Sequence, residues 1–188
     1  MGRRVLIVGP PGAGKGTQAV MVARALGVPH ISTGEMLRAQ VARGTDLGKQ
    51  AKVIMDSGAL VPDAIVIAMV KERLAEADAG CGFLLDGFPS TAAQAEALDR
   101  EVAGRPLELV LSLEVGEDEV VRRLLKRAES EGRSDDTEET VRNRMAVYRE
   151  QTEPLIAYYR SKGTLRPIDG MGTIGEIFSR IAAALAAA

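Results

Sequence analysis

A glycine-rich segment that ends in lysine is the part of the sequence best suited to phosphate chemistry. Residues 9–15 match the pattern G-x-x-x-x-G-K, between an apolar run at residues 5–8 and a segment that we expect to be helical. Glycines let backbone N–H groups point into one cradle, a helix N-terminus adds positive potential, and Lys15 can reach the outer phosphates. The strict pattern has serine or threonine directly after the lysine, whereas here Gly16 precedes Thr17. The segment predicts binding of a nucleoside triphosphate with Mg²⁺, and the alternative is a plain strand-to-helix turn.

An aspartate at the end of another apolar run is suited to a magnesium ion. Asp86 follows residues 83–85 and precedes Gly87. In an open α/β sheet this position lies at the carboxyl edge of a strand, where ligands bind. Magnesium prefers oxygen ligands and keeps much of its hydration, so the Asp86 carboxylate would hold a water molecule of its shell. The alternative is a simple Asp-Gly turn.

Three arginines lie on expected helices. Ser32 and Glu35 have the spacing of a capping box at a helix start, and Arg38 follows one turn later. Its guanidinium offers a planar fork that matches phosphate oxygens. In the basic segment 118–127, Arg123 and Arg127 are four residues apart and therefore share one helix face.

A polar stretch at residues 129–136 separates this basic helix from the next one. It contains Arg133, Asp135 and Asp136, and Arg144 follows on the next helix. Phosphoryl transfer needs positive charge around three equatorial oxygens and the exclusion of water, and arginines on a closing lid serve both needs. The ordinary alternative is a solvated basic helix.

The composition excludes several classes of protein. Lys and Arg total 24 against 26 Asp and Glu, so the net charge of −2 argues against a nucleic-acid binder that relies on positive charge. The 188 residues are 46% hydrophobic and 27% charged, as in ordinary globular domains. The single cysteine, Cys81, can form neither an internal disulfide nor a cysteine-rich zinc site. We expect one domain without structural zinc, in which the single histidine, His30, packs or caps a strand.

The sequence shows neither a secretory nor a membrane segment. The apolar run at residues 5–8 stops at Gly9, short of the roughly 7 to 15 residues of a signal peptide's apolar region. An apolar run of about 20 residues, as needed to span a bilayer, is also missing. We expect a cytoplasmic protein that contacts no membrane.

Apolar runs alternate with helical patterns along the chain. The runs predict strands at residues 5–8, 30–32, 83–85, 107–115 and 165–168. Helices are expected at residues 18–26, 33–43, 49–57, 62–79, 91–102, 118–127, 137–162 and 174–187, with Pro154 kinking or splitting the seventh. This alternation predicts an α/β fold with a five-stranded parallel sheet covered by helices on both faces.

Four motifs together resemble one known family. They are residues 9–17 (Gly-Pro-Pro-Gly-Ala-Gly-Lys-Gly-Thr), residues 31–38 (Ile-Ser-Thr-Gly-Glu-Met-Leu-Arg), residues 86–89 (Asp-Gly-Phe-Pro) and the pair Asp135-Asp136. In this order they resemble adenylate kinases of the nucleoside-monophosphate kinase family, over residues 5–169. The resemblance implies a P-loop NTPase fold and the reaction of ATP with AMP to give two ADP.

The resemblance also implies a role for each matching residue. It assigns ATP binding to Gly12, Ala13, Gly14, Lys15, Gly16, Thr17, Arg123 and Arg127. It assigns AMP binding to Thr33, Arg38, Met55, Val61, Gly87, Gln94, Arg133 and Arg144. It assigns catalysis to Lys15, Arg127, Arg133, Arg144, Asp135 and Asp136. It assigns Mg²⁺ binding, largely through water, to Thr17 and Asp86.

Two mobile parts follow from the same resemblance. Residues 33–64 would form an AMP-binding subdomain, and residues 128–136 a lid of the short form. Some long lids in the family hold zinc, which this lid could not do because it has no cysteine. We expect both parts to close over the substrates of a monomeric enzyme.

Ser90 is the one departure from the family's motifs. The family has arginine directly after Asp-Gly-Phe-Pro, where it would clamp the AMP phosphate, whereas this chain has Ser90. The expected protein is thus an adenylate kinase with weakened AMP binding, because Arg100 and Arg105 lie a helix or more away. A kinase for UMP or CMP is one alternative, against which Thr33 and Gln94 speak. A nucleotide-binding protein with a degraded acceptor site is the other.

Overall fold

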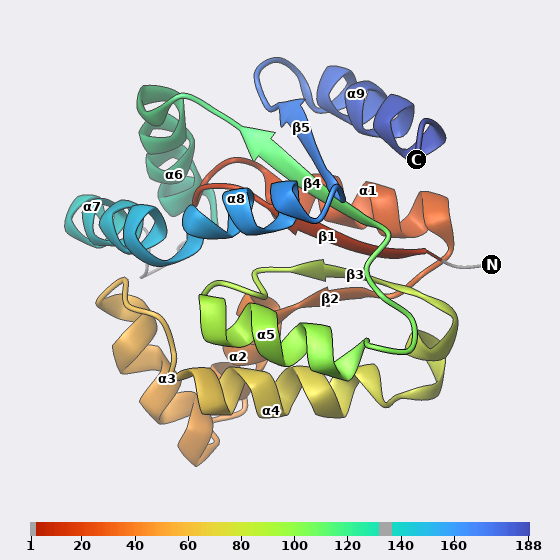
Figure 1. Cartoon of the computed structure of the whole chain (residues 1–188). Helices are drawn as coiled ribbons and strands as arrows, with labels where there is room; N and C mark the ends of the chain where they lie inside the picture. Colours follow the sequence, from red (N-terminus) through yellow and green to blue (C-terminus); the bar gives the residue numbers. More distant parts are fainter. Residues whose placement is uncertain (1–2, 132–136) are drawn as a thin grey trace.

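A five-stranded parallel sheet forms the centre of the computed structural model, which describes residues 3–131 and 137–188. The strands lie in the order β2-β3-β1-β4-β5 (Figure 1). Branched apolar residues form them because such side chains pack well on a pleated sheet that is buried on both faces. The strands are β1 (Arg4–Val8), β2 (His30–Ser32), β3 (Phe83–Asp86), β4 (Leu109–Glu114) and β5 (Leu165–Asp169).

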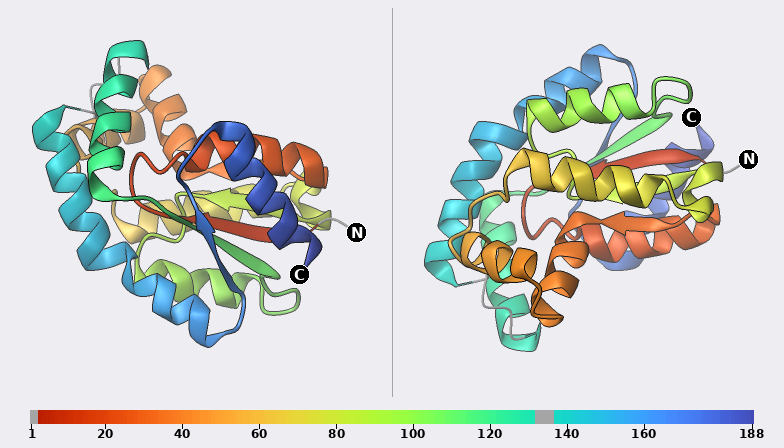
Figure 2. Two further views of the ribbon diagram at one scale, coloured as in Figure 1. Left: turned by 90° about the horizontal axis from the view of Figure 1, so that it is seen from above. Right: turned by 90° about the horizontal axis from the view of Figure 1, so that it is seen from below.

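Helices cover both faces of this sheet, as the two views in Figure 2 show. They are α1 (Lys15–Leu26), α2 (Thr33–Ala42), α3 (Asp46–Asp56), α4 (Asp63–Leu74), α5 (Ala92–Glu101), α6 (Glu117–Glu131), α7 (Glu138–Val147), α8 (Pro154–Ser161) and α9 (Ile174–Ala186). A short 3-10 helix, η1, spans Ala77–Cys81, and a π-helical turn, η3, spans Tyr148–Thr152. The predicted fold class is confirmed.

Alternate residues of the central strand β1 point to opposite faces of the sheet. Val5 and Ile7 belong to a core cluster with residues of α1 and α9, whereas Leu6 and Val8 belong to a cluster with α4, α5 and α8. Val5 and Leu6 are fully buried. The strand is therefore apolar from Val5 to Val8, because both of its faces are covered by helices.

Several predicted helix ends are wrong by a few residues. The segment expected as one helix at 62–79 divides into α4 and η1, and α3 starts at Asp46 rather than at residue 49 because Thr45 caps it. The helix expected to end at Arg127 continues to Glu131, since alanine and glutamate are good helix formers even within a polar stretch. Residues 132–136 of the expected lid lie outside the described residues.

Pro154 divides the long segment 137–162 as predicted. The segment becomes α7, η3 and α8, and Pro154 is the first residue of α8. Proline suits this position because its missing N–H is not needed in the first turn of a helix.

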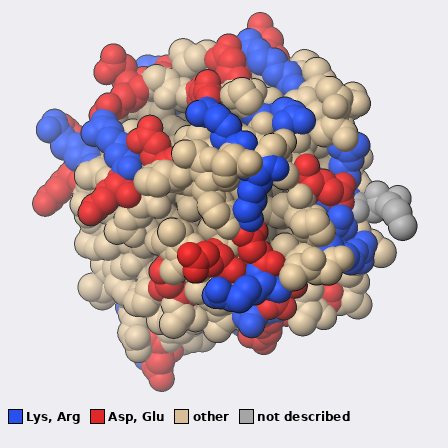
Figure 3. Space-filling view, viewed as in Figure 1, with Lys and Arg blue, Asp and Glu red and all other residues tan. Residues whose placement is uncertain are grey.

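Charges of both signs are mixed on the surface in Figure 3, where basic and acidic side chains lie interspersed. Several of them form ion pairs, such as Arg73 with Asp78 at 2.7 Å. Within residues 3–131 and 137–188, no helix has the length and apolar character that crossing a membrane requires.

The hairpin of α2 and α3 contains one close backbone contact. Gly48 of α3 is buried, and a Cβ atom built on it would lie 2.1 Å from the carbonyl oxygen of Gln40 in α2. The Thr45 hydroxyl accepts a hydrogen bond from the Gly48 N–H (3.0 Å) and donates one to the side-chain oxygen of Gln40 (2.9 Å). The two helix backbones therefore touch where no side chain fits.

We expect Gly48→Ala to lower the free energy of unfolding by about 1–3 kcal/mol, the usual cost of overpacking. The new methyl group must push α3 away from α2, which outweighs the gain in helix propensity. Urea unfolding followed by circular dichroism measures the effect. The control is Gly175→Ala in α9, where a Cβ atom would meet nothing within 4 Å. Equal stability changes in the two variants would contradict the close contact.

Candidate active site

One large cavity lies at the carboxyl ends of β1, β2 and β3. It has a volume of about 920 Å³. Its walls come from the β1–α1 loop, the start of α2, the β3–α5 turn, and parts of α6 and α7. Ligands of open parallel sheets bind at this edge because the loops that follow neighbouring strands meet there.

The β1–α1 loop is shaped by glycine. Gly12 and Gly14 have φ angles of 80° and 90°, in the region that favours glycine. A Cβ atom on Gly12 would also lie 2.7 Å from Cγ of Leu124 and 2.9 Å from the carbonyl oxygen of Val120, both in α6. Only glycine at position 12 therefore lets α6 approach the loop. The residues predicted to bind ATP all line the cavity, namely Gly12, Ala13, Gly14, Lys15, Gly16, Thr17, Arg123 and Arg127.

Lys15 is held at the mouth of this loop by two backbone carbonyl groups. Its Nζ donates to the oxygens of Gly9 (2.8 Å) and Pro10 (2.9 Å). Burial is the main cause that lowers the pKa of Lys15 to about 8; Asp86 opposes the shift, and Arg144 and Arg127 contribute to it. The pocket thus brings several cations together, and an anionic ligand would relieve their repulsion.

Asp86 ends β3 beside the loop and is buried, with 7% of its surface exposed. Its Oδ2 lies 3.4 Å from Nε2 of His30, a contact that the sequence did not predict. Asp86 and Thr17 both line the cavity and supply a carboxylate and a hydroxyl oxygen. The described residues hold no group of three or more His, Cys, Asp or Glu suited to a metal. Two oxygen donors fit a magnesium ion that keeps water and phosphate oxygens as its other ligands.

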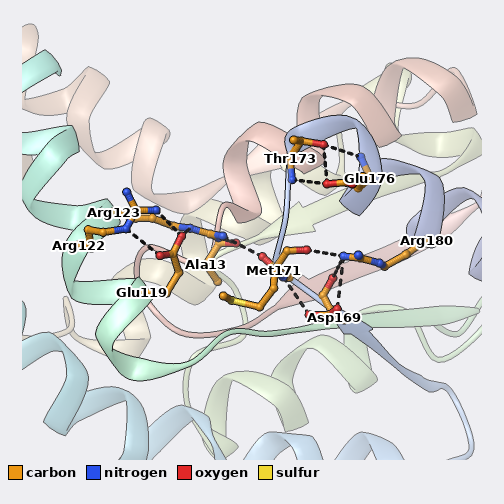
Figure 4. Close-up of polar contacts among 10 residues, drawn as sticks. Ala13, Glu119, Arg122, Arg123, Asp169, Met171, Thr173, Glu176 and Arg180 are labelled. Atoms are coloured by element: carbon orange, nitrogen blue, oxygen red, sulfur yellow. Dashed lines mark hydrogen bonds and ion pairs between the residues drawn. The ribbon is translucent and has the colours of Figure 1, made fainter.

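Arg123 crosses from α6 to two loops (Figure 4). Its Nε donates to Glu119 (2.6 Å), and its two other nitrogens lie within hydrogen-bonding distance of the carbonyl oxygens of Ala13 (3.4 Å) and Gly170 (3.0 Å). Hydrogen bonds from Arg122 and Arg123 lower the pKa of Glu119 to about 2. The guanidinium plane of Arg123 is therefore fixed between the phosphate loop and the loop before α9.

The opposite wall of the cavity starts at α2. Ser32 N-caps this helix by accepting from the N–H of Glu35 at 3.4 Å. The buried Thr33 faces Gly87, whose φ is 78° and on which a Cβ atom would lie 2.9 Å from the Thr33 hydroxyl oxygen. The Arg38 guanidinium lies over Gly34 and lines the cavity.

Gln94, on the same wall, is held on both sides of its amide. It is 1% exposed and yet lines the cavity. Its Nε2 donates to Oδ1 of Asp63 (2.7 Å), and its Oε1 accepts from the backbone N–H of Ser90 (2.7 Å). Thr91 caps α5 by accepting from the Gln94 N–H at 3.2 Å. The cap follows from the sequence, whereas Asp63 as a partner does not, because it lies 31 residues away.

Ser90 uses its hydroxyl locally. The Oγ donates to the carbonyl oxygen of Gly87 (2.8 Å), and the Ser90 carbonyl accepts from the Thr152 hydroxyl (2.8 Å). Arg100 lies near Glu96 and is 73% exposed, while Arg105 donates to the carbonyl oxygen of Gly80, and neither lines the cavity. Neither arginine therefore replaces the one expected at position 90.

The end of α3 contacts α7 across the cavity. The Thr140 hydroxyl donates to the carbonyl oxygen of Asp56 (2.9 Å), and Asn143 donates to that of Ser57 (2.5 Å). A Cβ atom on Gly58 would lie 3.1 Å from Cγ of Arg144. The cavity lining on this side includes Met55, Val61 and Arg144.

Comparison with known proteins decides the family. A family model described as adenylate kinase matches residues 7–164. An adenylate kinase of Thermobifida fusca is 56% identical over 97% of both chains, and one of Thermus thermophilus is 54% identical over 98% of both. A third, of Stenotrophomonas maltophilia, is 49% identical over 97% of this chain and 98% of its own. This chain belongs to the adenylate kinase family. The resemblance seen in the motifs is confirmed, and the protein is a phosphotransferase of the nucleoside-monophosphate kinase class.

Most residues that the adenylate kinase motifs single out meet in the one cavity. Its lining includes Thr33, Arg38, Met55, Val61, Asp86, Gly87, Gln94 and Arg144 as well as the loop residues. Arg133, Asp135 and Asp136 lie outside the described residues. The sequence missed Asp63 and His30 as contacts of Gln94 and Asp86, because only the folded chain brings these segments together.

We expect the affinity for ATP to fall as the pH rises above about 8, the pKa of Lys15 in the free protein. Lys15 is charged below this pH and neutral above it, and phosphates bind the charged form. The loss should approach about tenfold per pH unit, as for release of one proton. Calorimetric titration with Mg-ATP between pH 7 and 9.5 measures it. Lys15→Arg, which does not titrate in this range, should show a flat profile; an equal decline there would assign the effect to another group.

We expect Glu119→Gln to raise the KM for ATP about two- to fivefold, as for loss of a partly exposed ion pair. Arg123 keeps its two carbonyl contacts but loses the carboxylate that fixes its Nε. Steady-state kinetics with ATP varied measure the change, and the KM for AMP should stay constant. Glu138→Gln removes the exposed pair with Arg142 on α7 and serves as the control. Equal KM values for ATP in the two variants would contradict the role of Glu119.

Proposed function

We propose that this chain transfers the γ-phosphoryl group of ATP to AMP, reversibly and with Mg²⁺, to give two ADP. A phosphate oxygen of AMP forms the new P–O bond, and the bond from the γ-phosphorus to the β–γ bridging oxygen breaks. The observation that carries the proposal is that one large cavity is lined both by the phosphate loop and by Thr33, Arg38 and Gln94. A donor and an acceptor phosphate can meet there without water between them.

The donor side comprises the phosphate loop and Arg123. Backbone N–H groups of Gly12–Thr17 would bind the ATP phosphates, and Lys15 would leave its two carbonyl contacts to reach the outer phosphates. Arg123, held flat by Glu119 and two carbonyl groups, is suited to stack on the ATP base. Arg123 is thus positioned before the nucleotide arrives, whereas the Lys15 side chain would move when it binds.

The acceptor side comprises the AMP-binding residues of α2, the β3–α5 turn and the end of α3. Thr33 and Gln94 are suited to hydrogen-bond the adenine, and Met55 and Val61 offer it an apolar wall. Arg38 and Arg144 would bind the AMP phosphate. The predicted roles of Arg133, Asp135 and Asp136 in the lid at 128–136, and that of residues 33–64 as a closing subdomain, stay predictions.

The transfer itself depends on position and charge. Arg127 and Arg144 lie close enough to Lys15 to affect its charge, and the positive potential of the three groups would stabilise the phosphoryl group in transfer. Asp86 and Thr17 would hold the magnesium ion, largely through water. A bound magnesium ion neutralises charge on the β- and γ-phosphate oxygens.

Ser90 should weaken AMP binding. A bidentate arginine contact to a desolvated phosphate contributes about 2–4 kcal/mol, so its absence costs on the order of 30- to 1,000-fold in kcat/KM. The Ser90 hydroxyl is already bonded to the Gly87 carbonyl. Arg38 and Arg144 are then the cations of the described acceptor wall. A monomeric state and a cytoplasmic location stay predictions from the sequence.

We expect Ser90→Arg to lower the KM for AMP or raise turnover, by tenfold or more in kcat/KM. The arginine would add a third cation to the acceptor phosphate site, whereas the KM for ATP should not change. A coupled assay of ADP formation measures this, with AMP titrated at saturating Mg-ATP. Equal kcat/KM for both proteins would show that another cation serves this phosphate.

The same assay separates the alternative functions. Faster turnover of UMP or CMP than of AMP would favour a pyrimidine-nucleotide kinase. Nucleotide binding without turnover in either protein would favour a binding protein with a degraded acceptor site. The arginines near Lys15 argue against a protein that only binds nucleotides, since such a protein has little use for cations directed at a transferring phosphoryl group.

A further inference from the structure

The amide of Gln94 has only one pair of hydrogen-bonding groups left for a ligand. An amide carries two N–H donors and two oxygen lone pairs. One donor is used by Oδ1 of Asp63 and one lone pair by the N–H of Ser90, each at 2.7 Å. The two partners bond to different atoms of the amide, so one N–H donor and one oxygen lone pair remain for the cavity that Gln94 lines.

The two partners also fix which end of the amide is which. If the amide turned over, its oxygen would face the Asp63 carboxylate and its NH₂ would face the Ser90 N–H. Both contacts would be repulsive, and both groups would lose a hydrogen bond in a buried place, because Gln94 is 1% exposed. The orientation is therefore set by Asp63 and Ser90 and not by the ligand.

Asp63 is itself held in place. It lies in the first turn of α4, where a carboxylate is favoured by the helix dipole. Both of its oxygens lie 3.0 Å from the hydroxyl oxygen of Thr91, the residue that caps α5. The carboxylate thus ties the starts of two helices together and points one oxygen at Gln94.

This orientation discriminates between purines at position 6. A 6-amino purine such as adenine offers a donor at N6 and an acceptor at N1, which match the amide oxygen and N–H. A 6-oxo purine such as hypoxanthine offers an acceptor at O6 and a donor at N1, which match only the turned amide. We propose that Asp63 is a positioning residue that locks the Gln94 amide and so makes the acceptor site select 6-amino over 6-oxo purine monophosphates.

The proposal rests on the proposed function in one respect, the contact of Gln94 with the acceptor base. Asp63→Asn tests the added role of Asp63. The Oδ1 atom of Asp63 accepts from both Thr91 and Gln94. In the asparagine of this variant either the oxygen or the NH₂ can take this place, and the NH₂ favours the turned amide. The variant therefore no longer fixes the Gln94 amide in one orientation. A site that rejects a base through mismatched buried groups loses selectivity when the groups can adapt.

The experiment compares kcat/KM for AMP and for IMP, with saturating Mg-ATP, in the wild type and Asp63→Asn. We expect the wild type to prefer AMP and the variant to reduce this preference at least about tenfold, partly through a gain with IMP. A merely structural role of Asp63 would lower both values alike and leave their ratio unchanged, which would overturn the proposal. Asp46→Asn, in the first turn of α3 with a 93% exposed side chain, is the control.

A second pair of variants separates the proposal from its premise. If Gln94→Ala leaves the AMP-to-IMP ratio at the wild-type value, Gln94 does not contact the base and the premise fails. If Gln94→Ala abolishes the preference and Asp63→Asn does not change it, the proposal alone fails. We expect Asp63→Asn to have no further effect on the ratio in the Gln94→Ala background, because Asp63 acts through Gln94.

A measurement on the unchanged protein covers the case in which Asp63→Asn does not fold. We expect the Gln94 side-chain amide, assigned by its absence in Gln94→Ala, to show slow hydrogen exchange by NMR. Exchange at the rate of an exposed glutamine side chain would show that the lock is absent and would overturn the proposal.

Discussion

Strand β3 pairs in parallel with β1 on one side and with β2 on the other, and the site depends on this pairing. Ile7 pairs with Asp86, and Ser32 pairs with the same aspartate from the other side. Because parallel strands end at one edge, the phosphate loop, Asp86 and the start of α2 meet there although they are far apart in the chain. The apolar residues of β1 make this pairing stable, since Val5 and Leu6 are fully buried between two layers of helices.

Concentrated positive charge is the second feature of the cavity. Lys15 is desolvated, and Arg127 and Arg144 lie close enough to disfavour its charge. The repulsion between these cations destabilises the free protein. Phosphates relieve it when they bind, and a preorganised site of this kind stabilises a transferring phosphoryl group. Glycine at position 12 permits this closeness, because a side chain there would collide with α6.

A chain of hydrogen bonds organises the part of the acceptor wall around Gln94. Gln94, Ser90 and Asp63 form one chain of contacts between the starts of α4 and α5. Serine at position 90 fits this arrangement by bonding to Gly87. In the proposed complex the AMP phosphate would therefore be bound by the arginines of α2 and α7, and the Gln94 amide would bind the base.

The sequence by itself determined the family, the α/β class, the phosphate loop and the cap at Ser32, because each motif behind them consists of residues within a few positions of one another. Helix ends such as that of α6 were harder to predict from the sequence, since the composition of a polar stretch is compatible with both a loop and a helix. Only the tertiary structure decided that Asp63 holds Gln94, that His30 lies beside Asp86 and that Arg123 bonds to Ala13 and Gly170. These partners are 31 to 110 residues apart, and such contacts are set by how the helices pack on the sheet and not by local spacing.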